Sequence, residues 1–187
     1  MGRPKLLLSY RGGTVLGSLV AALRAARVEP IVVVASAGDA ELRAWCETAA
    51  GVITALNPRP ERGMLSSILE GLEALGGAAE LARREEPLLV TPGDLPALRP
   101  ATVGELLRRR HAAGARLAVP VYRGRRGHPL VLAPAIIPEI PRLDPARGLH
   151  QLLDRYPKEV LKVEVDDPGC VADLDVPEDY ERLREGD

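Results

Sequence analysis

Apolar residues follow two patterns along the chain: short continuous runs, and longer stretches in which they recur at helical spacing. The continuous runs are short and rich in leucine or β-branched residues, which is typical of buried strands. They cover residues 31–35, 52–56, 88–94, 117–121, 128–133 and 160–165. The periodic stretches predict helices over residues 14–27, 36–50, 63–75, 101–113, 135–140 and 148–156, and a last helix from residue 177.

Strands and helices alternate over much of the chain, which predicts an α/β fold built on a parallel sheet with right-handed crossovers. The order changes after Tyr122, where residues 123–127 are predicted to form a flexible loop. The strands on either side of so short a loop pair antiparallel, because a parallel return needs a crossover of about a dozen residues or more. The chain contains no repeat or linker, so we expect a single domain over residues 1–187.

The composition is that of an ordinary soluble domain, with 187 residues of which 46% are hydrophobic and 27% charged. The formal net charge is -1 and no long block of like charge occurs, so we expect neither a nucleic-acid nor a membrane partner. Cys46 and Cys170 lack the spacing of a zinc site and indicate a reducing compartment. The chain shows no signal peptide and no stretch long enough to span a membrane, so we expect a cytoplasmic location.

The first candidate for chemistry is Asp94, a single carboxylate in the segment Gly93-Asp94-Leu95-Pro96. The apolar run before it predicts a buried central strand of the parallel sheet, which places Asp94 at the carboxyl edge where ligands bind. An acid in that position is a candidate metal ligand. The alternative is structural, because aspartate also closes turns and caps helices such as the one after Pro100.

Lys5 and the pair Asp173 and Asp175 are the other charged candidates. Lys5 stands out because arginine supplies nearly all the basic charge of the chain. If residues 173–175 are extended, the two acids project on the same side. One lysine with two separated acidic positions fits a Mg²⁺-assisted phosphoryl-type site, whereas the alternative makes Asp173 a turn acid and Asp175 a helix cap.

Ser66 and Ser67 lie in the first turn of the helix that begins near Gly63. Free N–H groups and the helix dipole attract anions at such a position. Ordinary capping by the serines is the alternative, and it is compatible with a bound phosphate.

Five segments of the chain match, in order, the motifs of one protein family. Met1–Leu8 matches the second half of L-A-A-G-x-S-x-R-M-G-x-x-K-L-L-L; Asn57 with residues 63–72 matches N-x-x-x-x-x-G-M-x-x-S-I-x-x-G-L; Gly93–Pro96 matches D-x-P; Gly127–Pro129 matches G-H-P; and residues 173–179 match D-I-D-T-P-E-D. The chain thus resembles the MobA-like nucleotidyltransferases, which include the molybdopterin cytidylyl- and guanylyltransferases, and is most similar to the cytidylyltransferase (MocA-like) branch.

The resemblance implies a three-layer α/β/α, Rossmann-like fold of the nucleotide-diphospho-sugar transferase type, with a mostly parallel sheet and one antiparallel strand. It implies transfer of a nucleotidyl group from CTP or GTP to a phosphorylated, pterin-type acceptor, with release of pyrophosphate. In that scheme Lys5 contacts the triphosphate, Asp94, Asp173 and Asp175 hold Mg²⁺, and His128 lines the acceptor side. Gly63, Ser66 and Ser67 lie near the nucleotide, and a molybdoenzyme or its chaperone is a possible partner.

The chain departs from the family pattern at its start. The family's first strand and glycine-rich loop precede the R-M-G motif, whereas the printed chain begins at the Met of that motif, so we expect weak or no turnover from it. A second hypothesis is therefore a catalytically deficient accessory protein that delivers a pterin cofactor to a molybdoenzyme. A third is a nucleotidyltransferase for another phosphorylated small molecule on the same fold.

Overall fold

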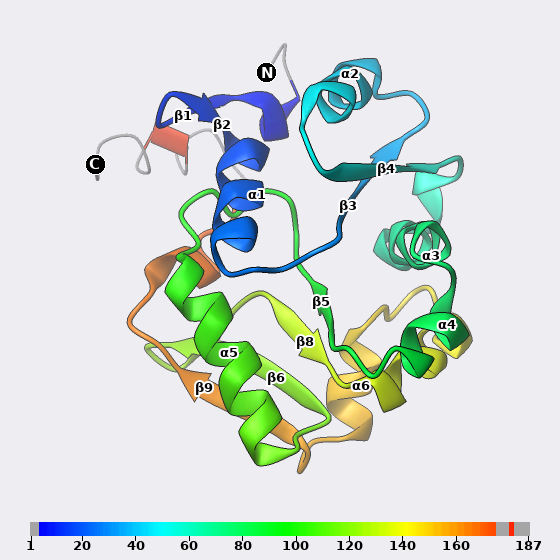
Figure 1. Ribbon diagram of the computed structural model, residues 1–187, viewed down its shortest axis with the longest axis vertical. Helices are drawn as coiled ribbons and strands as arrows, with labels where there is room; N and C mark the ends of the chain where they lie inside the picture. Colours follow the sequence, from blue (N-terminus) through cyan, green and yellow to red (C-terminus); the bar gives the residue numbers. More distant parts are fainter. Residues whose placement is uncertain (1–3, 175–179, 182–187) are drawn as a thin grey trace.

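The computed structural model describes residues 4–174, 180 and 181 and shows an α/β protein (Figure 1). The strands are β1 (Ser9–Tyr10), β2 (Gly13–Thr14), β3 (Ile31–Ser36), β4 (Val52–Asn57), β5 (Leu88–Val90), β6 (Leu117–Tyr122), β7 (Arg125–Arg126), β8 (Leu130–Leu132) and β9 (Val160–Glu164). The α-helices are α1 (Val15–Ala25), α2 (Ala40–Thr48), α3 (Met64–Ala74), α4 (Ala78–Arg83), α5 (Pro100–Ala113) and α6 (His150–Arg155). The 3-10 helices are η1 (Lys5–Leu7), η2 (Pro60–Arg62), η3 (Pro134–Arg142) and η4 (Pro168–Val171).

The main strands form two hydrogen-bonded groups. β3 pairs with β4 in parallel, and a second sheet has the order β5-β8-β6-β7 with β9 in parallel beside β6. β8 is antiparallel to both β5 and β6, so these two strands run in the same direction. The prediction of a mostly parallel fold with one antiparallel strand is therefore confirmed, with β8 as that strand and β7 as the short return of a hairpin.

The predicted position of β5 was wrong in one respect. It is not the buried centre of a parallel sheet, because within the described residues it pairs only with β8, and that pairing is antiparallel. Its three residues are consequently only half-buried. The direction of the strand is nonetheless as expected, so the loop that follows β5 still carries Asp94.

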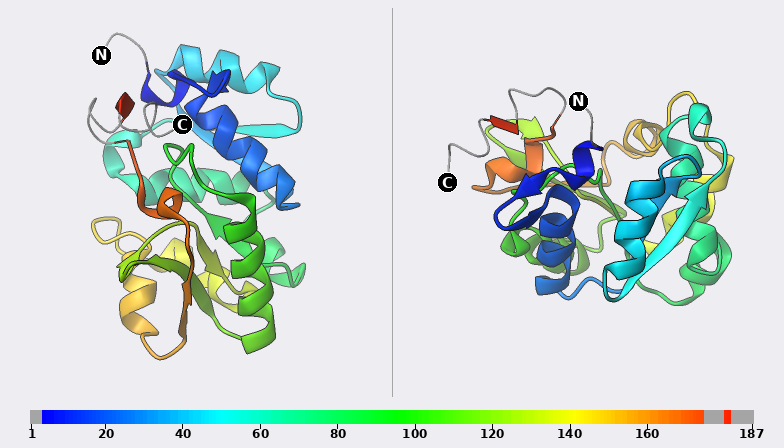
Figure 2. Two further views of the ribbon diagram at one scale, coloured as in Figure 1. Left: turned by 90° about the vertical axis from the view of Figure 1, so that its left-hand side faces the viewer. Right: turned by 90° about the horizontal axis from the view of Figure 1, so that it is seen from above.

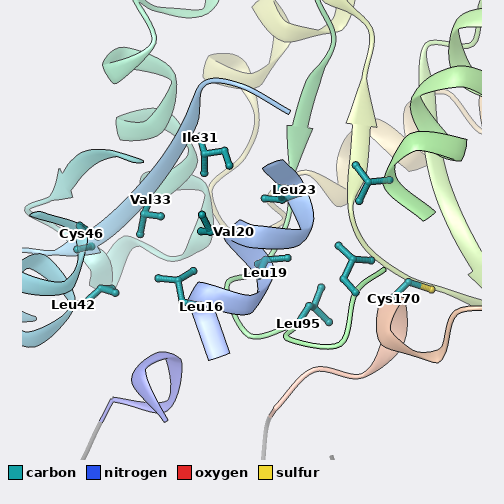
Figure 3. Close-up of a cluster of buried hydrophobic side chains, with 13 residues drawn as sticks. Leu16, Leu19, Val20, Leu23, Ile31, Val33, Leu42, Cys46, Leu95 and Cys170 are labelled. Carbon is teal, nitrogen blue, oxygen red and sulfur yellow. The ribbon is translucent and has the colours of Figure 1, made fainter. Parts of the chain in front are cut away.

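A first apolar core lies between β3 and the helices α1 and α2. Alternate residues of β3 are buried in it, namely Ile31, Val33 and Ala35. Figure 3 shows α1 in the middle of this core, with Leu16 directed toward β3 and α2 and Leu19 toward Leu95 in the loop after β5. The packing of α1 thus joins the β3–β4 pair to the segment that carries Asp94.

The second sheet is covered on both faces, which makes the fold three-layered. Leu117 and Val119 of β6 pack with α3, η3 and α6, whereas Ala118 between them packs with Leu106 of α5. This alternation follows from the two-residue period of a strand. Each face buries apolar side chains at a gain of about 25 cal/mol per Å² of surface removed from water.

Two local predictions needed correction. Residues 76–86, where the sequence pattern predicts neither a strand nor a helix, contain the helix α4. Residues 123–127, expected to be a flexible loop, form a tight hairpin in which Tyr122 pairs with Arg125. Leu6 and Leu7, for which no element was predicted, belong to the short 3-10 helix η1. Among the described residues, no helix has the length and apolar character needed to cross a bilayer.

Candidate functional site

Three segments that are far apart in the sequence meet at the side chain of Lys5. Its Nζ donates to Asp94 Oδ2 at 2.6 Å and to the carbonyl oxygen of Leu174 at 3.1 Å. The helix η1, the loop after β5 and the segment after η4 therefore lie together toward one end of the molecule (Figure 2). The structure thus brings together Lys5 and Asp94, which the sequence predicts to belong to one site.

Asp94 is held in place by the packing of its neighbours. Only 6% of the residue is exposed, and Leu95 beside it is buried in the first core. A Cβ on Gly93 would lie 3.2 Å from Leu6 Cδ2, so the absence of a side chain lets the loop approach η1 closely. Arg99, not Asp94, occupies the position before α5, and the capping alternative for Asp94 is wrong.

His128 reaches the same region through a close contact between the start of β8 and η4. Its backbone N–H donates to the Cys170 carbonyl oxygen at 2.7 Å. A Cβ on Gly127 would overlap that carbonyl and lie 2.9 Å from Cys170 Sγ, so only glycine permits the approach. Gly127 and η4 therefore fix where His128 lies.

The charges of Asp94 and Asp173 both influence the pKa of His128. Desolvation by the surrounding protein lowers the pKa of His128 below its usual value, while Asp173 and Asp94 act in the opposite direction and His150 lowers it further. The lowered pKa favours the neutral imidazole at neutral pH, although the residue as a whole is exposed. A neutral imidazole can line a binding site, but it does not attract an anion by charge.

A pocket opens beside His128 and Asp173. Its wall also contains Arg125 and Arg126 of β7, and its other lining residues are Leu95, Gly127, Cys170 and Val171. The sequence pattern assigns both arginines to a predicted flexible loop, because the short strand β7 that presents them was not expected.

The other predicted cluster, Ser66 and Ser67, is organised by Asn57 at the end of β4. Asn57 is 1% exposed, and its Nδ2 donates to Ser66 Oγ at 2.8 Å and to Ser67 Oγ at 2.9 Å. Ser66 Oγ in turn donates to the Gly63 carbonyl oxygen at 2.7 Å. Gly63 occupies the position before α3, and no side chain caps the helix, so the capping alternative for the serines is wrong.

A second pocket lies over this first turn of α3. It is lined by Asn57, Arg59, Arg62, Leu65, Ser66, Leu69, Glu70 and Pro145. Asn57 and the arginines were missed as site residues. A polar residue that ends a β-branched strand, as Asn57 does, was the signal that could have identified the first of them.

The predicted metal ligands are placed in part. Asp94 and Asp173 both act on the pKa of His128, so they lie in one region. Asp173 is exposed, and Asp175 lies outside the described residues. Residues 4–174, 180 and 181 contain no group of three or more histidine, cysteine, aspartate or glutamate side chains arranged to hold a metal. The described part of the site thus offers two carboxylates.

Comparison with known proteins identifies the family. Residues 1–160 match the family model described as the MobA-like NTP transferase domain. No curated protein sequence matches the chain.

Solved structures agree with this match. The manganese complex of Rv0371c from Mycobacterium tuberculosis H37Rv is 30% identical, with a TM-score of 0.70 and coverage of 98% of this chain and 93% of that one. A nucleotidyl transferase from Methanothermobacter thermautotroptrophicus is 25% identical, with a TM-score of 0.78 and coverage of 97% and 84%. Molybdopterin-guanine dinucleotide biosynthesis protein A from Archaeoglobus fulgidus, at 16% identity, a TM-score of 0.60 and coverage of 98% and 90%, shares the fold. The chain therefore belongs to the MobA-like NTP transferase domain family and is a nucleotidyltransferase.

Proposed function

We propose that the protein transfers a nucleoside monophosphate from CTP or GTP to a phosphorylated small molecule such as molybdopterin, in the cytoplasm and with Mg²⁺. The observation that carries this proposal is the meeting of Lys5 with Asp94 after β5, in a chain that belongs to a nucleotidyltransferase family. A lysine point charge beside a strand-end carboxylate suits a triphosphate and its metal ion.

The reaction needs charge neutralisation and alignment more than proton transfer. An oxygen of the acceptor phosphate forms a bond to the α-phosphorus of the nucleotide, and the bond from that phosphorus to the bridging oxygen breaks, so that pyrophosphate leaves. The acceptor phosphate is largely ionised at neutral pH and requires no general base. Positioning and electrostatic stabilisation then supply the catalysis.

Asp94 and Asp173 are the residues that would hold the metal ion. Lys5 engages Asp94 Oδ2, and within the described residues Asp94 Oδ1 makes no hydrogen bond and remains available to a cation. Mg²⁺ is commonly bound by one or two carboxylates together with substrate phosphates, so two carboxylates fit it. Asp175 stays a proposed third ligand, and the manganese complex of the related Rv0371c protein supports the choice of a divalent cation. When bound, the ion would offset negative charge on the reacting phosphates.

Lys5 and the first turn of α3 would receive the nucleotide. Ser66 and Ser67 are fixed by Asn57, and Gly63 adopts a positive φ of 84° that turns the chain into the helix. Free N–H groups at the start of α3 favour an anionic ligand. On the opposite side of the reaction, His128 would line the acceptor subsite as a neutral ring.

Calorimetry tests the nucleotide part of this proposal. CTP and GTP are titrated into the protein with Mg²⁺ and with EDTA, and we expect binding of at least one nucleotide that depends on the metal. Asp94→Asn should abolish the metal dependence, whereas Asp166→Asn, which changes an exposed acid that makes no side-chain hydrogen bond among the described residues, should leave it intact.

The absence of nucleotide binding to the unaltered protein would contradict the proposal and favour the accessory function. Binding that Asp94→Asn leaves unchanged would remove Asp94 from the metal site. Pyrophosphate release on addition of molybdopterin then tests the acceptor separately.

A further inference from the structure

The pocket beside His128 contains two arginines that no carboxylate of the described residues neutralises. Arg125 and Arg126 are exposed, and within the described residues neither side chain makes an ion pair or a hydrogen bond. Several other arginines of the chain are paired, as in the contact of Arg116 with Glu159 at 2.7 Å. Two guanidinium groups that share a pocket wall without a partner are suited to an anionic ligand, because arginine matches phosphate oxygens with a planar fork of donors.

The arginines stand on a fixed hairpin. Arg123 and Gly124 both have positive φ, 48° and 79°, as the central residues of a tight hairpin turn require. Gly127 N–H donates to the Pro120 carbonyl oxygen at 2.9 Å, and the next residue is held to Cys170. The positions of the two arginine Cα atoms are therefore set before a ligand arrives, which lowers the ordering cost of binding.

The pocket includes part of the candidate metal site, because Asp173, one of the proposed metal ligands, lines its wall. Its formal charge is positive, with two arginines against one aspartate. A phosphate monoester carries about 1.5 to 2 negative charges at neutral pH, so it complements this wall. A metal ion on Asp173 would add further positive charge.

We propose that Arg125 and Arg126 form the subsite for the phosphate group of the acceptor and hold it beside Asp173. This inference rests on the proposed function, because it assigns the attacking phosphate of that reaction to this pocket. The phosphates of the nucleotide are also anionic, but in the proposed function they bind elsewhere, at Lys5 and the first turn of α3.

The probe for the subsite is inorganic phosphate, titrated into the protein by NMR or calorimetry with Mg²⁺, first alone and then with a saturating non-hydrolysable CTP or GTP analogue. We expect phosphate to bind in both cases. Arg125→Gln and Arg126→Gln should each weaken phosphate binding about 10-fold, since a charge-assisted contact contributes on this scale. Nucleotide affinity should stay unchanged in both variants.

Arg123→Gln is the matched control. Arg123 belongs to the same hairpin, but its guanidinium lies 5.2 Å from the Tyr122 ring centroid and does not line the pocket. Phosphate binding within about twofold of the unaltered protein is expected for this variant. An equal loss in Arg123→Gln would show a general charge effect and overturn the subsite.

The outcomes separate this inference from the proposed function. Phosphate binding that depends on Arg125 and Arg126, in a protein that binds no nucleotide, would support the anion pocket and contradict the nucleotide-dependent reaction. Displacement of phosphate by the nucleotide analogue would overturn the subsite, because the pocket would then hold the nucleotide's own phosphates. Nucleotide binding with phosphate affinity unaffected by either arginine variant would also overturn it.

Discussion

Replacing Asp167 by alanine should destabilise the protein more than any other loss of a single acid from η4 or its flanks. Asp167 is 2% exposed and precedes η4. Its carboxylate accepts hydrogen bonds from Arg99 N–H at 3.0 Å, from Thr102 Oγ1 at 2.6 Å and from Gly169 N–H at 2.9 Å. These bonds join the segment before η4 to the first turn of α5.

The size of the effect follows from what the substitution leaves behind. Three buried or half-buried donors lose their acceptor, and an unsatisfied buried donor costs about 1–3 kcal/mol. Water can reach the partly exposed Arg99, and the three losses share one site, so they do not add fully. We expect a loss of about 3 kcal/mol in the free energy of unfolding, a large part of the roughly 5–15 kcal/mol that a domain possesses.

Urea unfolding followed by circular dichroism measures this change, and thermal unfolding should fall by about 6–12 °C for a chain of this length. Thr102→Val, which removes one donor and its bond, should cost about 1 kcal/mol. Asp166→Ala is the control, because this neighbouring acid is exposed, and we expect a change within about 0.5 kcal/mol. Equal stabilities for Asp167→Ala and Asp166→Ala would refute the role assigned to the buried carboxylate.

Three further results are expected. Gly127→Ala should cost about 1–3 kcal/mol of stability in urea unfolding, because its Cβ would overlap the Cys170 carbonyl; an unaltered midpoint would contradict that contact. Asn57→Ala should weaken nucleotide binding in calorimetry at least about 10-fold by releasing the serines of α3, and unchanged affinity would separate Asn57 from the nucleotide subsite. In metal-free buffer, the NMR titration midpoint of His128 should lie below about 6.5 and fall further in Asp173→Asn, because that carboxylate raises the pKa. Since the folded state binds this proton less readily than the unfolded chain, the contribution of His128 to stability is lost as pH falls from about 6.5 through the folded-state pKa.

The regular part of the fold was predictable because its signals are local. The β-branched run that begins at Ile31 became β3 almost residue for residue, and the helical spacing after Thr14 became α1, with the Thr14 side chain accepting from Gly17 N–H. The helix α4 was missed because it is short and follows two glycines. The hairpin after Tyr122 was missed because it requires a positive φ at Arg123, which a non-glycine residue seldom adopts.

The chemistry of the site was predictable by residue type but not by geometry. Lys5 and Asp94 were both predicted as site residues although 89 positions separate them in the sequence, and only the folded chain shows their 2.6 Å contact. The role of Asn57 could not be inferred from spacing, because its bonds to the serines depend on how β4 turns into α3. The pocket containing Arg125 and Arg126 depends on the unexpected hairpin and on the approach of η4.

The two halves of the proposed site rest on different structural supports. The nucleotide side depends on the turn from β4 into α3, which Asn57 organises, whereas the acceptor side depends on η4, which Asp167 fastens to α5. The carbonyl oxygen of Cys170 in η4 accepts a hydrogen bond from His128 N–H, just before β8. The position of η4 therefore helps to determine the positions of His128 and of the hairpin that carries Arg125 and Arg126. Asp94 has a support of its own, because its loop packs against α1 and its carboxylate accepts a hydrogen bond from Lys5. A substitution that destabilises η4 should consequently weaken binding of the acceptor phosphate more than binding of the nucleotide. This difference is expected if the acceptor phosphate binds at a separate subsite on β7.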